Sequence, residues 1–130
     1  MVASSYYEKA LANFKTAKII VSLAPNDEEQ LNQAAYHLQQ ALELAIKHIF
    51  CIKGLPLQKT HDIDQLIVYA RDSGVDLYLP DYFIQKAEMI SNWESKTRYV
   101  LGFKLELEKI RTTIDELQSY FEILSKKLKY

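Results

Sequence analysis

Apolar residues recur at intervals of three and four along most of this 130-residue chain, the spacing that is typical of amphipathic helices. The clearest segment extends from about Asp27 to Lys53. Within it, residues 33–45 contain no Gly, Pro or β-branched residue, which strongly favours a helix. At about 100° per residue, one side of that helix is apolar. It carries Leu31, Ala34, Ala35, Leu38, Leu42, Ala45, Ile49 and Ile52.

The opposite side of this predicted helix is polar. Its pole and flanks carry Gln33, Tyr36, His37, Gln40, Glu43 and Lys47. An amphipathic helix packs its apolar side into a core and leaves the other side free. We therefore expect the polar side to be either a solvated surface or the place where function resides.

Two boundaries of the central helix are signalled by the residues beside it. Residues 5–8 form a capping box (SYYE) that predicts the start of a preceding helix, and Pro25 stops that helix near Leu23. Asn26 or Asp27 can cap the central helix. Gly54 ends it, and a proline two residues later prevents its continuation.

Shorter helices follow. Thr60 is the candidate N-cap of a helix that ends at Gly74. Asp81 can cap the next helix, which would enclose apolar residues between Phe83 and Ile90, Ile84 and Ala87 among them. Residues 93–100 are compatible with either the frayed end of that helix or a structured loop.

A last helix is predicted from about Gly102 to Lys127. Its apolar residues alternate at spacings of four and three, which forms a heptad seam. The seam consists of Phe103, Leu107, Ile110, Ile114, Leu117, Phe121, Leu124 and Leu128. It favours a bundle core, with a helix-to-helix dimer contact as the alternative. Short loops make neighbouring helices antiparallel, so the sequence predicts an all-α, up-and-down antiparallel bundle. We expect four main helices plus a shorter fifth in one domain, 1–130.

Composition narrows the class of protein. A content of 48% hydrophobic and 25% charged residues is ordinary for a globular protein, and three Gly and three Pro disfavour a turn-rich β fold. A net charge of −1 argues against broad nonspecific nucleic-acid binding. The single cysteine, Cys51, lies on the apolar side of the central helix and predicts a buried thiol. No signal peptide or membrane span is evident, so we expect a cytoplasmic protein.

The sequence contains few of the motifs that metal binding or nucleophilic catalysis requires. His37 and His48 recur on one side of the central helix but are separated by about 16 Å of helical rise, too far to share a metal ion. The metal-binding patterns HExxH and CxxC are missing, and no Gly-rich phosphate loop occurs. We therefore expect no metal, no cofactor and no catalytic residue of these kinds.

The remaining candidates lie beside helix ends. Lys59, Thr60 and His61 precede a predicted helix, where free N–H groups and the helix dipole favour anions. Arg98 suits bidentate binding of phosphate or carboxylate, and Tyr99 can stack on a ligand. The plainer alternatives are a capped helix start in the first case and an Arg98–Glu94 ion pair in the second. We expect the single tryptophan to belong to the core.

Several of these blocks together resemble the HEPN domain. They are residues 35–47 (AYHLQQALELAIK), then Gly54, residues 59–66 (KTHDIDQL) and residues 97–99 (TRY). Their order and intervals are similar to those of the family, and the resemblance extends from about Tyr6 to Leu124. It implies an all-helical bundle that commonly dimerises. It also implies one of two functions, nucleotide binding or metal-independent RNA cleavage with an Arg-x4–6-His motif.

The ribonuclease motif does not occur in this chain. Its only arginines are Arg71, Arg98 and Arg111, and its last histidine is His61, so no histidine follows an arginine. We therefore predict a noncatalytic homodimer that binds a nucleotide or another phosphorylated ligand. The alternatives are an interaction partner of a minimal nucleotidyltransferase, as in toxin–antitoxin pairs, and a ribonuclease with a different residue set. The candidate ligand-binding residues are His37, Gln40, Lys47, Lys59, Thr60, His61, Arg98 and Tyr99.

Overall fold

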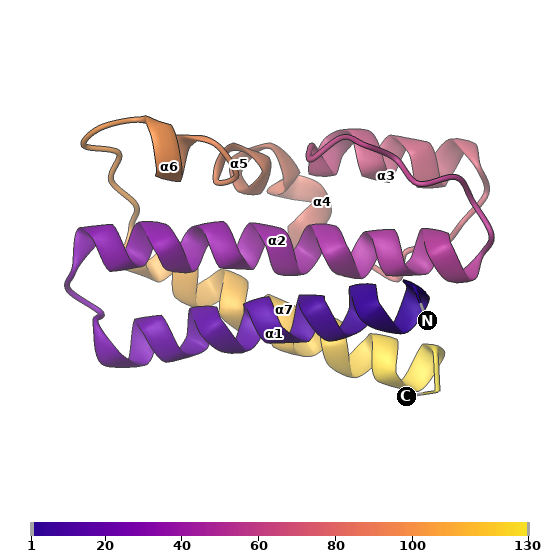
Figure 1. Ribbon diagram of the computed structural model, residues 1–130, viewed down its shortest axis with the longest axis horizontal. Coiled ribbons are helices and arrows are strands. Elements are labelled where there is room, and N and C mark those ends of the chain that lie inside the picture. Colours follow the sequence, from indigo (N-terminus) through magenta and orange to yellow (C-terminus); the bar gives the residue numbers. More distant parts are fainter. Residues whose placement is uncertain (1, 130) are drawn as a thin grey trace.

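The computed structural model describes residues 2–129, and within that range the regular structure is entirely helical, as predicted (Figure 1). Four helices are ten residues or longer, and three short helices lie between the third and fourth of them. In chain order the elements are α1 (Val2–Leu23), α2 (Glu28–Ile52), α3 (Ile63–Asp72), α4 (Asp81–Gln85), α5 (Ala87–Asn92), α6 (Lys96–Tyr99) and α7 (Leu107–Lys127).

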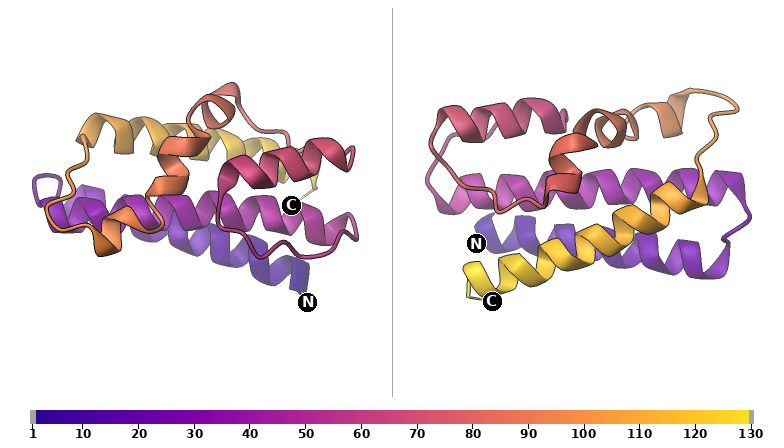
Figure 2. Two further views of the ribbon diagram at one scale, coloured as in Figure 1. Left: turned by 90° about the horizontal axis from the view of Figure 1, so that it is seen from above. Right: turned by 180° about the vertical axis from the view of Figure 1, so that it is seen from behind.

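The helix α2 lies in the middle of the molecule. α1 runs antiparallel along one side of it, while α3 and the short helices α4 to α6 line the opposite side (Figure 1). α7 crosses obliquely behind α1 and α2, as the views from above and behind show (Figure 2). α2 accordingly contacts α1, α3, α5, α6 and α7. Its polar side therefore faces other parts of the chain.

The predicted limits of α2 are confirmed. Asp27 is the N-cap, and its side chain accepts a hydrogen bond from the Gln30 N–H at 3.1 Å. Lys53 is the C-cap, and its N–H donates to the Ile49 carbonyl at 3.0 Å. Gly54 follows with a φ of 73°, a left-handed conformation that glycine adopts without a steric cost.

Three predicted helix starts are wrong. α1 begins at Val2, so the Ser5 box lies inside the helix instead of before it. The N-cap of α3 is Asp62, whose carboxylate accepts the Asp64 N–H at 2.9 Å. Thr60 lies two residues earlier, where its hydroxyl accepts the Asp62 N–H at 3.0 Å. Asp81 is the first residue of α4 and follows an N-cap proline.

The predicted fourth helix is divided. α4 ends at Gln85, Lys86 leaves helical geometry with φ −105° and ψ 12°, and α5 begins at Ala87. The break leaves Ile84, which the sequence places inside the helix, 54% exposed. Residues 93–100 form a structured segment that contains α6, and Trp93 is only 1% exposed. The prediction of a core tryptophan is confirmed.

The last helix starts later than predicted. α7 begins at Leu107, because Gly102 adopts a φ of 71° and residues 103–106 precede the helix without belonging to it. The Phe103 carbonyl accepts a hydrogen bond from the Asn32 amide of α2 at 3.1 Å. From Ile110 to Leu124 the heptad seam is buried or packs against the core of the same chain. The seam therefore serves the bundle core.

The core forms where α1, α2 and α7 meet and extends under α3 and α5. Large apolar side chains of α2, such as Leu38 and Ile46, are fully buried. Two predictions about the end of α2 need correction. Cys51 is only partly buried, and Ile52 is 40% exposed, although Ile49 and Phe50 just before them are fully buried.

Candidate functional site

The polar side of α2 is buried in the C-terminal half of the helix and exposed or partly exposed in the N-terminal half. Gln39, Glu43 and Lys47 are 0%, 3% and 7% exposed. Of the two alternatives for this side, a solvated surface or a functional one, the first does not hold at Lys47, since other helices cover it. Gln33, nearer the N-terminus of α2, remains exposed. Burial of charged groups requires partners for each of them.

Those partners converge on the Glu43 carboxylate. Its Oε1 accepts a hydrogen bond from Gln39 Nε2 at 2.9 Å, and its Oε2 accepts one from Lys47 Nζ at 3.0 Å. Gln39 is held in turn by Gln40, whose Nε2 donates to Gln39 Oε1 at 2.7 Å. The buried carboxylate and ammonium thus neutralise each other within one helix, at i and i+4.

His61 approaches the same carboxylate from the loop before α3. Its Nδ1 lies 3.1 Å from both Oε1 and Oε2 of Glu43. Gln39 Nε2 also donates to the His61 carbonyl at 3.1 Å, which fixes the backbone at this point. The His61 side chain is 57% exposed. Because a carboxylate only accepts, Nδ1 is the donor in this contact.

Arg98, from α6, lies over the N-terminal half of α2. Its guanidinium stacks over the rings of Tyr36 at 4.9 Å and Tyr99 at 4.8 Å. The predicted pairing with Glu94 is also present, with Nη2 at 2.5 Å from Oε1 and Nε donating to the Glu94 carbonyl at 2.8 Å. The Arg98 side chain remains 34% exposed, and Tyr99 is 72% exposed.

These contacts lie along a single line on α2, which we call the α2 stripe: Tyr36, Gln40, Glu43 and Lys47. Residues separated by four and three positions lie on one side of a helix. Tyr36 and Glu43 are two turns apart, or about 10 Å along the axis. Arg98 contacts Tyr36, and His61 contacts Glu43. The structure thus places both groups over one stripe.

His37 is directed elsewhere. Its Nδ1 lies 2.7 Å from the amide oxygen of Asn13 in α1. The Asn13 amide nitrogen donates to the Lys9 carbonyl at 2.9 Å, so its oxygen faces the imidazole. Burial lowers the pKa of His37 below the ordinary value for histidine. His37 therefore belongs to the α1–α2 contact, away from His61.

At the N-terminus of α3, two of the N–H groups that the sequence led us to expect as free have acceptors within the chain. The Ile63 N–H donates to Ser91 Oγ at 2.8 Å, and the Asp64 N–H to Asp62 at 2.9 Å. The Thr60 hydroxyl accepts a hydrogen bond from the Asp62 N–H. The capping carboxylate also adds a negative charge at this helix end. Lys59 is exposed beside it.

Sequence reasoning missed the buried part of this network. Gln39 received no role, and Glu43 was placed only on the flank of a side that was either solvated or functional. The signal was present in the spacing, since Gln39, Glu43 and Lys47 follow one another at four-residue intervals. Such a row is typical of an exposed helix as well, so spacing alone could not reveal its burial.

The described residues contain neither a metal-binding cluster nor a membrane-spanning helix. Between residues 2 and 129, no three His, Cys, Asp or Glu side chains are grouped as a metal site would require. None of the helices in that range has the length and apolar character needed to cross a membrane.

Comparison with known families agrees with the fold and with the sequence blocks. The model of the HEPN domain matches residues 3–127, nearly the whole chain. The chain therefore belongs to the HEPN family. No curated protein and no solved structure matches it.

Proposed function

We propose that this HEPN domain is a noncatalytic module that binds a nucleotide or another phosphorylated ligand over the α2 stripe. The observation that carries the proposal is the fixed orientation of His61. Its Nδ1 is held at 3.1 Å by a buried carboxylate, while the side chain is 57% exposed. An imidazole oriented in this way presents Nε2 as a hydrogen-bond donor to an anion when both ring nitrogens carry protons.

Arg98 supplies the second cationic group of the proposed site. Arginine binds phosphate well because its planar guanidinium offers several donors. Glu94 occupies two of them in Arg98, which fixes the guanidinium and leaves the others for a ligand. The exposed ring of Tyr99 provides a surface on which a base can stack. In this proposal Gln40, Lys59 and Thr60 line the edges of the site.

Two of the predicted ligand contacts take different roles in this proposal. Lys47 pairs with Glu43, because its ammonium is buried against that carboxylate. His37 supports the packing of α1 on α2 through Asn13. We propose that neither side chain touches the ligand directly.

A thermal-shift titration with AMP, ADP, ATP and inorganic phosphate tests this function. A ligand that binds only the folded chain stabilises it by about 2.7 kcal/mol at a hundred times Kd. We expect at least one nucleotide to raise Tm, and we expect His61→Ala and Arg98→Ala to abolish the increase. The control is Arg71→Ala, an exposed arginine on α3. The absence of any shift at millimolar nucleotide would count against the proposal.

We also propose that the module is a cytoplasmic homodimer. α1 carries the exposed apolar residues Leu11, Ile19 and Leu23. Clustered exposed apolar side chains are typical of interaction surfaces. Sedimentation equilibrium should show a dimer that Ile19→Glu weakens, whereas a monomer at every concentration would contradict this part.

A second candidate function is interaction with a minimal nucleotidyltransferase. The observation that favours it is the exposed run Tyr99, Val100 and Leu101, with Leu101 99% exposed beside Arg98. A neighbouring reading frame that encodes such an enzyme, together with co-purification of the two proteins, would support it.

A ribonuclease with a different residue set is the third and least favoured function. His61 and Arg98 lie over one stripe in this chain, in the reverse order to the family motif. Incubation of the purified protein with RNA tests this. Cleavage that is lost on Arg98→Ala would replace the binding proposal.

A further inference from the structure

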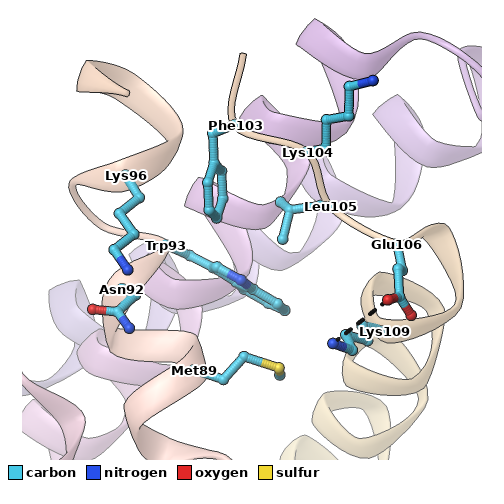
Figure 3. Close-up of a pocket in the computed structure, with 9 residues that line it drawn as sticks. All are labelled: Met89, Asn92, Trp93, Lys96, Phe103, Lys104, Leu105, Glu106 and Lys109. Carbon is cyan, nitrogen blue, oxygen red and sulfur yellow. Dashed lines mark ion pairs between the residues drawn. The ribbon is translucent and has the colours of Figure 1, made fainter. Parts of the chain in front are cut away.

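A groove outside the α2 stripe lies between α5 and the segment that leads into α7. It contains two adjacent hollows, of about 230 Å³ and 300 Å³, that share Met89, Glu106 and Lys109. The first hollow extends toward α6 and the second toward α4, where Tyr82 and Lys86 line it. Figure 3 shows the first hollow. No residue of the α2 stripe lines either one.

The first hollow has apolar walls. The indole of Trp93 crosses its base, the thioether of Met89 reaches toward the edge of the indole, and Phe103 and Leu105 lie on the other side (Figure 3). Trp93 itself is buried, whereas the other three are partly exposed. These surfaces suit an apolar side chain, which would cover the parts of the wall that water now contacts.

Positive charge surrounds the two hollows. Lys96 and Lys109 lie on opposite sides of the first hollow (Figure 3). Lys86 lines the second. Lys104 also lines the first hollow, although its ammonium points away from it. Without Lys104, whose ammonium lies 3.9 Å from Glu28, the lining contains three lysines against two glutamates, in a chain whose net charge is −1. The groove therefore attracts an anionic occupant.

The groove already contains one ion pair, between Lys109 and Glu106, and this pair is weak. Lys109 Nζ lies 3.8 Å from Glu106 Oε1, and the side chains are 51% and 71% exposed. A pair this exposed contributes little, about 1 kcal/mol at most. Lys109 can therefore turn to a carboxylate brought by a partner at small cost.

The first hollow, of about 230 Å³, is smaller than the pocket of about 300–1,000 Å³ that a drug-sized ligand usually occupies, and the second, of about 300 Å³, is at the lower limit of that range. A cavity of about 150 Å³ already holds a benzene ring, so a hollow of 230 Å³ takes one large side chain. Two such hollows in series match successive side chains of a peptide.

From this geometry we propose that the groove binds an acidic peptide segment of another protein. One large apolar side chain of that segment fills the hollow over Trp93. Carboxylates on either side of it reach Lys96 and Lys109. This binding is independent of the phosphorylated ligand proposed for the α2 stripe, because the two sites share no residue.

Selection from a phage-displayed library of random peptides on the immobilised full chain tests the proposal. The enriched peptides should contain a Leu, Met or aromatic residue flanked by Asp or Glu. A synthetic copy of the enriched peptide should change the fluorescence of Trp93, which is the only tryptophan in the chain. The fluorescence titration gives Kd directly at the proposed hollow.

The double variant Lys96→Glu/Lys109→Glu examines the role of charge. It should weaken peptide binding by about tenfold or more, because it replaces attraction by repulsion at both edges. The matched control is Lys9→Glu/Lys126→Glu, which makes the same charge change at exposed positions outside the groove. Thermal melts establish that both variants are folded.

Three results would overturn the proposal. One is the absence of any enriched peptide, and another is enrichment of neutral or basic sequences. The third is a Trp93 signal that responds to inorganic phosphate or a nucleotide but not to the selected peptide. That last result would make the groove a small-anion site.

Discussion

Glu43 combines two features at the scale of single residues. It is buried, and its two oxygens are shared among an ammonium and an amide of its own helix and an imidazole from another segment. A charge in such a place depends on its partners, since removing one of them leaves the others desolvated and unpaired. The carboxylate therefore couples stability to the orientation of His61.

Replacing Glu43 by Gln should destabilise the chain by about 3 kcal/mol, because the buried Lys47 ammonium loses its counter-charge. Urea unfolding measures this loss. The reference substitution is Glu28→Gln, at an exposed pair with Lys104 that spans 3.9 Å, where we expect a change below about 1 kcal/mol. Adding Lys47→Met to Glu43→Gln should recover part of the loss. If the double variant were less stable than the single one, the ion-pair explanation would be wrong.

His37 should make stability depend on pH. Burial lowers its pKa in the folded chain, so the unfolded chain binds more protons as the pH falls below about 6.5. Stability should therefore be complete above that pH and should decrease from there toward pH 5. The loss cannot exceed about 1.4 kcal/mol per pH unit. Urea midpoints of the native chain and of His37→Gln should converge as the pH falls, and parallel curves would contradict this cause.

The type of a residue predicted its burial correctly where the side chain is apolar. Leu38 and Ile46 are buried because they lie on or beside the apolar side of α2. The burial of Lys47 was missed because its type predicts exposure, and its burial depends on helices that are distant in the sequence. Arg98 was assigned two competing roles, an ion pair or a ligand contact. The structure confirms the ion pair with Glu94 and leaves the ligand contact as a proposal.

At the scale of elements, α3 is attached to α5 through its first turn. Ile63 is fully buried, and its N–H finds an acceptor in Ser91 Oγ of α5 at 2.8 Å. The same hydroxyl donates to the Ala87 carbonyl at 2.7 Å. Because the first turn of α3 is bonded to a side chain of α5, the loop before it, which includes His61, is held in a fixed place.

The substitution Ser91→Ala should therefore cost about 1–3 kcal/mol, because it leaves the Ile63 N–H buried without an acceptor. Ser119→Ala on the exposed side of α7 is the matched control and should be nearly neutral. Guanidinium unfolding gives both values. An equal, small effect of the two substitutions would mean that water replaces the serine hydroxyl.

The long helices were predictable because each has a cap or a breaker next to a regular apolar pattern. Asp27 and Gly54 mark the limits of α2 in this way. The division at Lys86 was not predictable, since no Gly or Pro occurs there. The late start of α7 has a local reason. Phe103 was counted in the heptad seam, yet its carbonyl is used by Asn32.

At the scale of the whole molecule, α2 is shared by both halves of the bundle. α1 and α7 pack on one part of its circumference, and α3, α5 and α6 cover the rest. The sequence indicated the all-α class and an amphipathic central helix. It did not indicate that a second layer covers the polar side, because the contacts that decide this join segments such as residues 43 and 61.

A shared central helix predicts a single unfolding transition. Trp93 fluorescence reports on the α5–α6 layer, whereas far-UV circular dichroism reports on all helices. The two curves in urea should coincide, as they do for a two-state domain. Leu38→Ala in α2 should move both to the same extent, by about 2–5 kcal/mol. A Trp93 transition at lower urea would show that the outer layer unfolds separately.

The coverage of α2 has a consequence for hydrogen exchange. An amide exchanges with solvent only when its hydrogen bond opens, and local opening is easiest where few buried contacts are lost. Any opening of the middle of α2 must displace helices on several sides. Its amides should therefore exchange only through global unfolding, while those of α6 exchange much faster. The slowest exchange rates in the molecule would then give the free energy of unfolding of the entire bundle.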